Sequence, residues 1–302
     1  MVMKEKAPIQ YLPSHEINKD KWDECVRRSS NGLLYADRIY LDMMTDHWNA
    51  AVIGDYEAVM PLPWRKKWMF KYYYHAAFVP QTGIYGPLDA SLYKPLTKLI
   101  FKKIKYGDIL LNYGNADYAE HLSARPLVNM TLDLSPDYET LRGKFHRDIE
   151  KNLKKSARHN LNYLPGNNVK KCVQLFRKQY GSRIISLKRS DYERFTSLCL
   201  HLLHINQAII RKVTDKNGRL LALALMLKDD RRIYNMMNTV LPDGKSKSAN
   251  HFLFDQMIRE FAGSGLVFDF EGSDVSGIKK FYKNFGAANE PYFLYSRFSS
   301  WI

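Results

Sequence analysis

Apolar and polar residues follow two patterns along the chain, one with the period of a helix and one typical of short buried strands. In the first half the pattern predicts helices over residues 17–28, 37–47 and 91–105, and strands over 49–54, 57–63, 70–77, 108–113 and 127–134. Gly54, Asp55 and Tyr56 separate the first two strands and indicate a hairpin. The strands of this half are therefore expected to form one sheet flanked by helices.

The second half opens with a strong helix start, because Ser135 can cap a helix and Pro136 suits its first position. Apolar residues then recur at helical spacing on one stripe, at Tyr138, Leu141, Phe145, Ile149 and Leu153. We therefore predict a single linking helix over 135–160. Helices are further predicted over 169–180, 190–204, 248–261 and 276–285, and strands over 208–213, 220–228, 232–240, 266–270 and 291–298.

Both halves thus show the same order of elements: helices, three antiparallel strands, a helix and further strands. This repeat predicts two lobes, residues 1–134 and 135–302, each a largely antiparallel mixed sheet flanked by helices. The expected fold class is α/β.

The charge adds a constraint on partners. The 302 residues carry 46 Lys and Arg against 31 Asp and Glu, a formal charge of +15, while 45% of residues are apolar. Such a chain can bury a core, which excludes a disordered basic tail. The positive balance favours an anionic partner: nucleic acid, a phosphorylated small molecule or a membrane surface.

The compartment is predicted from cysteine usage. The 3 Cys (Cys25, Cys172 and Cys199) are far apart and form no C-x-x-C pair, which fits a reducing cytoplasm. No apolar run approaches the roughly 20 residues of a membrane span, and the first residues lack a signal-peptide pattern. We expect a cytoplasmic protein without a transmembrane segment. We expect no metal site, and His201 and His204 are interpreted as structural histidines.

Two stretches carry a family resemblance. The segment 267–287, VFDFEGSDVSGIKKFYKNFGA, contains a D-F-x-G-S strand end followed by a helix that ends in F-G. The segment 132–158, LDLSPDYETLRGKFHRDIEKNLKKSAR, contains a D-L-S strand and a basic helix. Together they resemble the Fem family of peptidoglycan interpeptide-bridge aminoacyltransferases and its wider GNAT (acyl-CoA N-acyltransferase fold) relatives.

The resemblance implies tandem GNAT-like lobes that move an acyl or aminoacyl group onto an amine. In bridge-forming members the donor is aminoacyl-tRNA and the acceptor is a nucleotide- or lipid-linked muropeptide. Tyr282 stands where the family has a lysine, and Lys283 follows one place later. The turn 243–250 lacks the glycine pattern with which GNAT enzymes hold the pyrophosphate of coenzyme A at a helix N-terminus. No tightly bound cofactor is expected, with aminoacyl-tRNA or acyl-CoA as the donor.

Candidate catalytic residues lie at the end of the strand 266–270. Asp269 and Glu271 alternate along it and share one face, so either carboxylate could take the proton of the amine. For Asp269 the alternative is a capping or ion-pairing role. Lys283 could stabilise an oxyanion as a fixed charge, or be a solvated surface lysine.

Further residues are candidates for substrate contact. Tyr234 and Asn238 are four apart on a predicted central strand and are expected to point the same way, with His251 near the start of the next helix. Ser273 and Tyr282 complete this set. Hydrogen bonding within the core is the alternative for each of the first three.

Two basic regions could bind an anion. The linking helix presents Arg147, Lys151, Lys154, Lys155 and Arg158 behind its apolar stripe, which suits a tRNA backbone, although a solvated helix face is the alternative. In the first half, Arg65, Lys66, Lys67 and Lys71 alternate with Trp64, Trp68 and Phe70. That composition suits base stacking with phosphate contact, or a hairpin tip at a membrane surface.

The leading hypothesis is a Fem-like, GNAT-type transferase of an acyl or aminoacyl group onto an amine acceptor, with a cell-wall precursor as one candidate acceptor. The rivals are an acyl-CoA-dependent N-acetyltransferase and a catalytically degenerate GNAT-like protein that binds nucleic acid.

Overall fold

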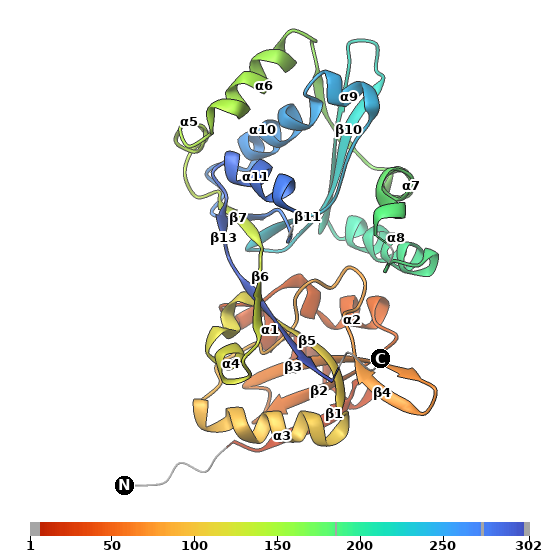
Figure 1. Ribbon diagram of the computed structural model, residues 1–302, viewed down its shortest axis with the longest axis vertical. Helices are drawn as coiled ribbons and strands as arrows, with labels where there is room; N and C mark the ends of the chain where they lie inside the picture. The colour runs from red at the N-terminus through yellow and green to blue at the C-terminus, as the bar shows by residue number, and fades with distance from the viewer. Residues whose placement is uncertain (1–6, 185, 273–274, 299–302) are drawn as a thin grey trace. The chain divides into compact units, whose positions relative to one another are not determined.

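The computed structural model describes residues 7–184, 186–272 and 275–298. The chain divides into two compact units: Met1–Leu127 with Pro291–Ile302, and Val128–Glu290. Figure 1 shows the elements of both. The division differs from the expected boundary at 134/135 because residues 130–133 form a strand of the second sheet and the last strand of the chain lies in the first.

The first unit contains a seven-stranded sheet in the order β1-β2-β3-β4-β5-β14-β6. Its strands are β1 (Ile9–Pro13), β2 (His47–Ile53), β3 (Ala58–Lys67), β4 (Phe70–Tyr73), β5 (Tyr106–Leu111), β6 (Arg125–Leu127) and β14 (Tyr292–Arg297). Neighbours are antiparallel except β4 and β5. Its helices are α1 (Lys19–Arg28), α2 (Arg38–Met44), α3 (Tyr93–Lys103) and α4 (Ala116–His121).

The second unit contains a seven-stranded sheet in the order β13-β7-β12-β11-β10-β9-β8. Its strands are β7 (Met130–Asp133), β8 (Asn162–Gly166), β9 (Ala208–Thr214), β10 (Leu220–Lys228), β11 (Arg232–Val240), β12 (Val267–Asp269) and β13 (Ala288–Asn289). Only β11 and β12 are parallel. Its helices are α5 (Tyr138–Arg142), α6 (Arg147–Ala157), α7 (Val169–Tyr180), α8 (Arg189–His204), α9 (Pro242–Ser246), α10 (Ala249–Phe261) and α11 (Ser276–Asn284).

Helices cover both faces of the second sheet. Figure 1 shows α6, α10 and α11 on one face and α7 with α8 on the other. The first face is closed by one apolar cluster, in which α10 places Leu253, Phe254 and Met257 against β10 and β12. β10 reads as a continuous apolar run because it is buried from both sides, whereas β11 interleaves polar residues with apolar ones. The predicted α/β class, with two mixed sheets flanked by helices, is confirmed.

The linking segment is two helices rather than the single predicted one. α5 ends at Arg142, and α6 begins at Arg147, where the His146 side chain accepts a hydrogen bond from the Asp148 amide. The ion pair between Arg142 and Glu150 spans the break, with two contacts of 3.0 Å. The predicted apolar stripe is nevertheless buried along its whole length in the core of the second unit. Burial of the stripe therefore tolerates a turn between the helices.

The last strand, β14, was expected in the second lobe and lies instead in the first sheet. It pairs with β5 on one side, at Phe293 with Leu111, and with β6 on the other, at Tyr292 with Leu127. Likewise the strand predicted over 127–134 is two strands, β6 in the first sheet and β7 in the second. An apolar run predicts a strand but contains nothing that selects its sheet.

Candidate functional site

The second unit has an open strand edge where its two parallel strands separate. β11 pairs with β12 at Arg232–Tyr234 only, opposite Val267–Asp269, although β11 continues to Val240. Within the described residues no strand pairs with this edge of β11 beyond Tyr234. Backbone groups freed in this way need other partners, such as a ligand or water.

Polar side chains without partners lie along the same strand. Asn235 Oδ1, Asn238 Nδ2 and Thr239 Oγ1 are all buried, and none has a hydrogen-bond partner in the described part of the chain. On α10, Asn250 Oδ1 is also buried without a hydrogen-bond partner in the described part of the chain. A buried amide or hydroxyl without a partner costs about 1–3 kcal/mol, so such groups mark a place where a ligand or water binds.

A bulge in β11 separates two residues that were expected to point the same way. Tyr234 pairs with Leu227 and Asn238 pairs with Ala224, and the register shifts between these pairs. Leu227 and Ala224 are three apart on a regular stretch of β10, so they face opposite sides of the sheet, and so do their partners. The expectation of a shared face is wrong because β11 holds one extra residue. Tyr234 is buried and donates to Asp229 at 2.5 Å, whereas Asn238 shares the α10 face with Ala224.

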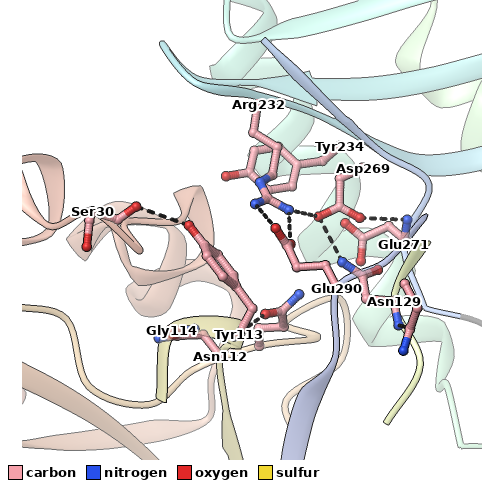
Figure 2. A network of polar contacts seen from close by, with 12 residues as sticks. Ser30, Asn112, Tyr113, Gly114, Asn129, Arg232, Tyr234, Asp269, Glu271 and Glu290 are labelled. Atoms are coloured by element: carbon pink, nitrogen blue, oxygen red, sulfur yellow. Dashed lines mark hydrogen bonds and ion pairs between the residues drawn. The ribbon is translucent and has the colours of Figure 1, made fainter. Parts of the chain in front are cut away.

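At the separation point an ion-pair network fixes the strand ends (Figure 2). Arg232 Nη1 lies 2.7 Å from both Asp269 Oδ2 and Glu290 Oε2, and Asn129 Nδ2 donates to Asp269 Oδ2 at 3.2 Å. Arg232 and Asp269 are almost fully buried. Burial alone lowers the pKa of Arg232, but the carboxylates of Asp269 and Glu290 outweigh it and raise that pKa. The guanidinium is thus permanently charged.

Asp269 therefore has the ion-pairing role that was the alternative for it. Its Oδ2 accepts from Arg232 and Asn129, and its Oδ1 accepts from the Glu271 amide at 2.9 Å. The side chain is fully buried. Its chemical effect is to hold the backbone of Glu271.

Glu271 is the carboxylate that remains close to the surface. It follows β12 with a φ of 64°, in the left-handed region that is costly for a residue with a side chain. Glu271 is half-buried. Burial is the main cause that raises the pKa of Tyr282, and the negative charge of Glu271 is the second. The Asp269 bond fixes the backbone of Glu271 in this left-handed conformation.

Tyr282 and Lys283 occupy different environments on α11. The Tyr282 ring packs on Phe270 with centroids 4.5 Å apart, so the position of the family's lysine holds part of an aromatic cluster. Lys283 is exposed in the last turn of α11. Ser273 lies outside the described residues. The structure thus places Tyr282 in the aromatic cluster, where the charge of Glu271 contributes to its raised pKa, and leaves Lys283 exposed to solvent.

His251 belongs to the same aromatic cluster. Its ring contacts Phe281 with centroids 5.1 Å apart. Burial, with the positive charge of Lys155 as a second cause, lowers the pKa of His251 to about 4. A neutral imidazole on the α10 face can accept or donate a hydrogen bond at pH 7.

The turn 243–250 is closed by its own contacts. It forms α9, in which a Cβ added at Gly244 would meet the Leu221 carbonyl oxygen at 2.2 Å. Lys247 pairs with Asp215 at 3.4 Å, and the Ser248 hydroxyl donates to Asn152 Oδ1 at 2.8 Å. The Lys247 ammonium and the Ser248 hydroxyl are thus engaged within the chain, while no side chain in the described part of the chain caps the amides at the start of α10.

The basic face of α6 is exposed as expected. Its five bases are all exposed and form no ion pair within the described residues: Arg147, Lys151, Lys154, Lys155 and Arg158. The opposite face buries Ile149 and Leu153. The helix therefore offers a continuous cationic surface.

The first unit shows what a closed version of the same strand pair looks like. β4 and β5 are parallel at two pairs, Tyr72 with Tyr106 and Tyr73 with Gly107. Beyond the end of β4, residues 82–85 take its place: Tyr85 exchanges two 2.8 Å bonds with Val59 of β3, and the Thr82 hydroxyl donates to the Leu110 carbonyl of β5 at 2.6 Å.

Side-chain amides complete this closure, and Figure 2 shows Asn112 beside Gly114. Asn112 Nδ2 donates to the Thr82 carbonyl at 2.8 Å, and Asn112 Oδ1 accepts from Asn31 at 2.9 Å and from the Gly114 amide at 2.9 Å. A cavity of only about 10 Å³ remains beside Thr82, which is at most the space of one water.

Sequence reasoning missed Arg232, Asn129 and Glu290. Arg232 and Glu290 are 58 positions apart, and Asn129 and Asp269 are 140 apart, so no local pattern connects them. One available signal was a charged residue, Arg232, at the start of a predicted central strand.

The described residues contain neither a candidate metal site nor a candidate membrane span. No group of three His, Cys, Asp or Glu side chains could hold a metal ion there, and none of the helices there combines the length and apolarity of a membrane span.

Comparison with known families gives one match. The acetyltransferase (GNAT) domain model matches residues 143–292, about half of the chain and most of the second unit. Comparison with curated protein sequences gives no significant match.

Solved structures share the fold over nearly the whole chain. FemX is 14% identical with a TM-score of 0.69, covering 95% of this chain and 97% of its own. A conserved protein of unknown function from Bacteroides thetaiotaomicron is 14% identical with a TM-score of 0.63, covering 95% and 98%. The C-terminal domain of a putative lysylphosphatidylglycerol synthetase from Agrobacterium fabrum is 12% identical with a TM-score of 0.58, covering 93% and 92%.

Proposed function

Because the chain is an acyltransferase with a GNAT domain in a Fem-like fold, we propose that it transfers an aminoacyl group from aminoacyl-tRNA onto an amine. The open edge of β11, with three buried polar atoms lacking partners, carries this proposal. The transfer takes place where β11 and β12 separate, beside Glu271. A cell-wall precursor with a free amine is the candidate acceptor, as the Fem resemblance implies.

The chemistry needs a proton acceptor and hydrogen-bond donors. The amine nitrogen forms a bond to the carbonyl carbon of the aminoacyl ester, the ester C–O bond breaks, and the amine proton passes by way of Glu271 to the leaving hydroxyl of the tRNA. Asn238 Nδ2 is a buried donor without a partner in the described residues, suited to the carbonyl oxygen. His251 and Tyr282 belong to the aromatic cluster of α10 and α11. Asp269 positions Glu271 by holding its amide.

Two features favour tRNA over acyl-CoA as donor. The exposed bases of α6 suit a polyphosphate backbone. The turn 243–250 lacks the glycine pattern of coenzyme A-binding enzymes, and its Ser248 hydroxyl is bonded to Asn152. An acyl-CoA-dependent N-acetyltransferase is the second candidate, favoured by the acetyltransferase domain match itself.

Transfer of a labelled amino acid from charged tRNA to amine-bearing muropeptides tests the proposal. Glu271→Gln is expected to lower turnover by about 10²–10⁴-fold, while Glu193→Gln, an exposed glutamate of α8, leaves it unchanged. Calorimetry with acetyl-CoA tests the second candidate. Micromolar binding together with acetyl transfer would identify acyl-CoA, and not aminoacyl-tRNA, as the donor.

Lys283→Ala decides the role of the exposed ammonium. A fall in turnover of about 10²-fold or more would place Lys283 at the oxyanion. A change within about threefold would remove Lys283 from the catalytic residues, since oxyanion donors contribute far more.

Filter binding across a salt series tests the basic face. Replacing Lys151 and Lys154 by Gln should reduce the slope of log affinity against log salt by about 0.7–0.9 for each charge. Replacing Lys170 and Lys171 of α7 provides the control. Tight tRNA binding with no transfer to any amine would favour a catalytically degenerate binding protein.

A further inference from the structure

The hairpin between β3 and β4 exposes three consecutive apolar side chains at its tip. Trp68 and Met69 form a two-residue loop closed by the pair Lys67 and Phe70. Trp68 is 88% exposed, Met69 86% and Phe70 65%. Trp68 has a φ of 55°, at a loop position where glycine is the favoured residue. A sequence that needed only a tight turn would not place tryptophan there.

Behind the tip lies a shallow apolar groove of about 670 Å³, whose lining residues all belong to the first unit. Tyr72 of β4 and Tyr106 of β5 are paired neighbours on one face and form its floor, with Phe70 and Phe298 beside them. The apolar surface of the tip therefore continues into the groove. Patches of this kind on a monomer mark an interaction site.

Basic residues surround this surface one or two positions behind the tip. Lys66 pairs with Lys71 and Lys67 with Phe70, and Arg65 follows, held by Asp46 at 2.6 Å. At about 3.3 Å per strand residue, the lysines lie about 3–7 Å behind Trp68. That spacing matches the depth of about 5–10 Å between the acyl boundary and the headgroups of a bilayer.

We propose that this hairpin docks the protein on the surface of an anionic lipid bilayer, with Trp68, Met69 and Phe70 in the interface and the lysines at the phosphates. Tryptophan has an apolar body and a polar N–H, which suits it to the headgroup level. Each basic residue near the surface strengthens binding to anionic lipid by about fivefold. The docking stands on the hairpin alone and does not depend on the proposed transfer reaction.

Membrane contact fits the tip better than single-stranded RNA does. Base stacking uses the faces of aromatic rings and gains nothing from an aliphatic apex. Met69, at the apex, is nearly as exposed as Trp68. Met69 therefore separates the two partners experimentally.

Sedimentation of the full chain with lipid vesicles tests the docking. We expect binding to vesicles containing phosphatidylglycerol, and little to pure phosphatidylcholine. The triple variant Trp68→Ser, Met69→Ser, Phe70→Ser should lower the partition coefficient by at least about 100-fold, since each large apolar side chain contributes about tenfold. The matched control Leu200→Ser with Ile205→Ser removes exposed apolar residues of the second unit and should stay within about twofold of the native chain.

Two further variants keep the result interpretable. Lys66→Gln with Lys67→Gln should lower binding to the anionic vesicles by about 25-fold, and Met69→Ser alone by about tenfold. Absence of vesicle binding by the native chain, or equal binding by the triple variant, would overturn the proposal. RNA binding that is lost in the triple variant but kept in Met69→Ser, without vesicle binding, would assign the hairpin to RNA.

Discussion

The two units contain the same parallel strand pair and end it in opposite ways. In the first unit, residues 82–85 fill the space beyond β4, and neutral amides satisfy one another around Asn112. In the second unit, β11 continues without a partner strand, and its polar atoms have no partners in the described residues. There the strand ends are held by a buried ion pair between Arg232 and Asp269.

The difference shows how one fold separates stability from function. The closed pair gains from its hydrogen bonds and leaves only about 10 Å³ beside Thr82. The open pair leaves buried polar groups unsatisfied, which is unfavourable unless a ligand or water occupies the site. Beside the opening, the buried pair of Arg232 and Asp269 acts as an anchor, because Asp269 accepts a hydrogen bond from the Glu271 amide and so holds Glu271 in place.

Loss of the anchor should have the largest effect on stability. Arg232→Ala leaves the Asp269 carboxylate buried without its main partner and should lower the free energy of unfolding by about 3–5 kcal/mol. Denaturant titration measures this. Arg219→Ala, which removes an exposed ion pair with Asp243, should cost at most about 1 kcal/mol. Equal losses in both variants would contradict the view that the second unit depends on a buried charge.

The amide network of the first unit should be weaker but still substantial. Asn112→Ala removes bonds to the Thr82 carbonyl and from Asn31, and should lower the free energy of unfolding by about 2–3 kcal/mol. Because the network is neutral, the loss should be the same at low and high salt. A loss below about 0.5 kcal/mol would mean that residues 82–85 close the gap without the amides.

These contacts also show where sequence reasoning succeeds. The bounds of β10 and β11 agree with the predicted 220–228 and 232–240, because turn residues precede both segments. The bulge in β11 was missed because nothing in the sequence of residues 232–240 marks where the extra residue falls. Glu271 was predicted from its place beside Asp269 at the end of a strand, whereas its support through Arg232 joins strands that only the folded sheet brings together.

A pH titration should distinguish the two strand pairs. His251 is neutral in the folded state, with a pKa of about 4, while the unfolded chain takes up its proton near the ordinary value of about 6.5. Its contribution is therefore complete above about pH 6.5 and is lost as the pH falls toward 4. With solvent screening of a partly exposed ring, the loss is about 1–2 kcal/mol.

The measurement compares unfolding at pH 7 and 4.5 in the native chain and in His251→Gln. The variant should lose about 1–2 kcal/mol less than the native chain between these values. Asn112→Ala, which removes no titratable group, should keep the native slope. An unchanged slope in His251→Gln would mean that His251 is protonated without penalty in the folded state.

The smallest effect gives the most direct comparison, because each unit has one buried threonine at its strand pair. Thr82 donates to the Leu110 carbonyl, and Thr239 Oγ1 has no partner in the described residues. Valine has nearly the same shape as threonine, so each substitution removes mainly the hydroxyl. Thr82→Val should therefore lower the free energy of unfolding by about 1 kcal/mol, and Thr239→Val should leave it unchanged or raise it by up to about 1 kcal/mol. If both variants were destabilised equally, the Thr239 hydroxyl would be hydrogen-bonded within the folded chain, and the second strand pair would be as closed as the first.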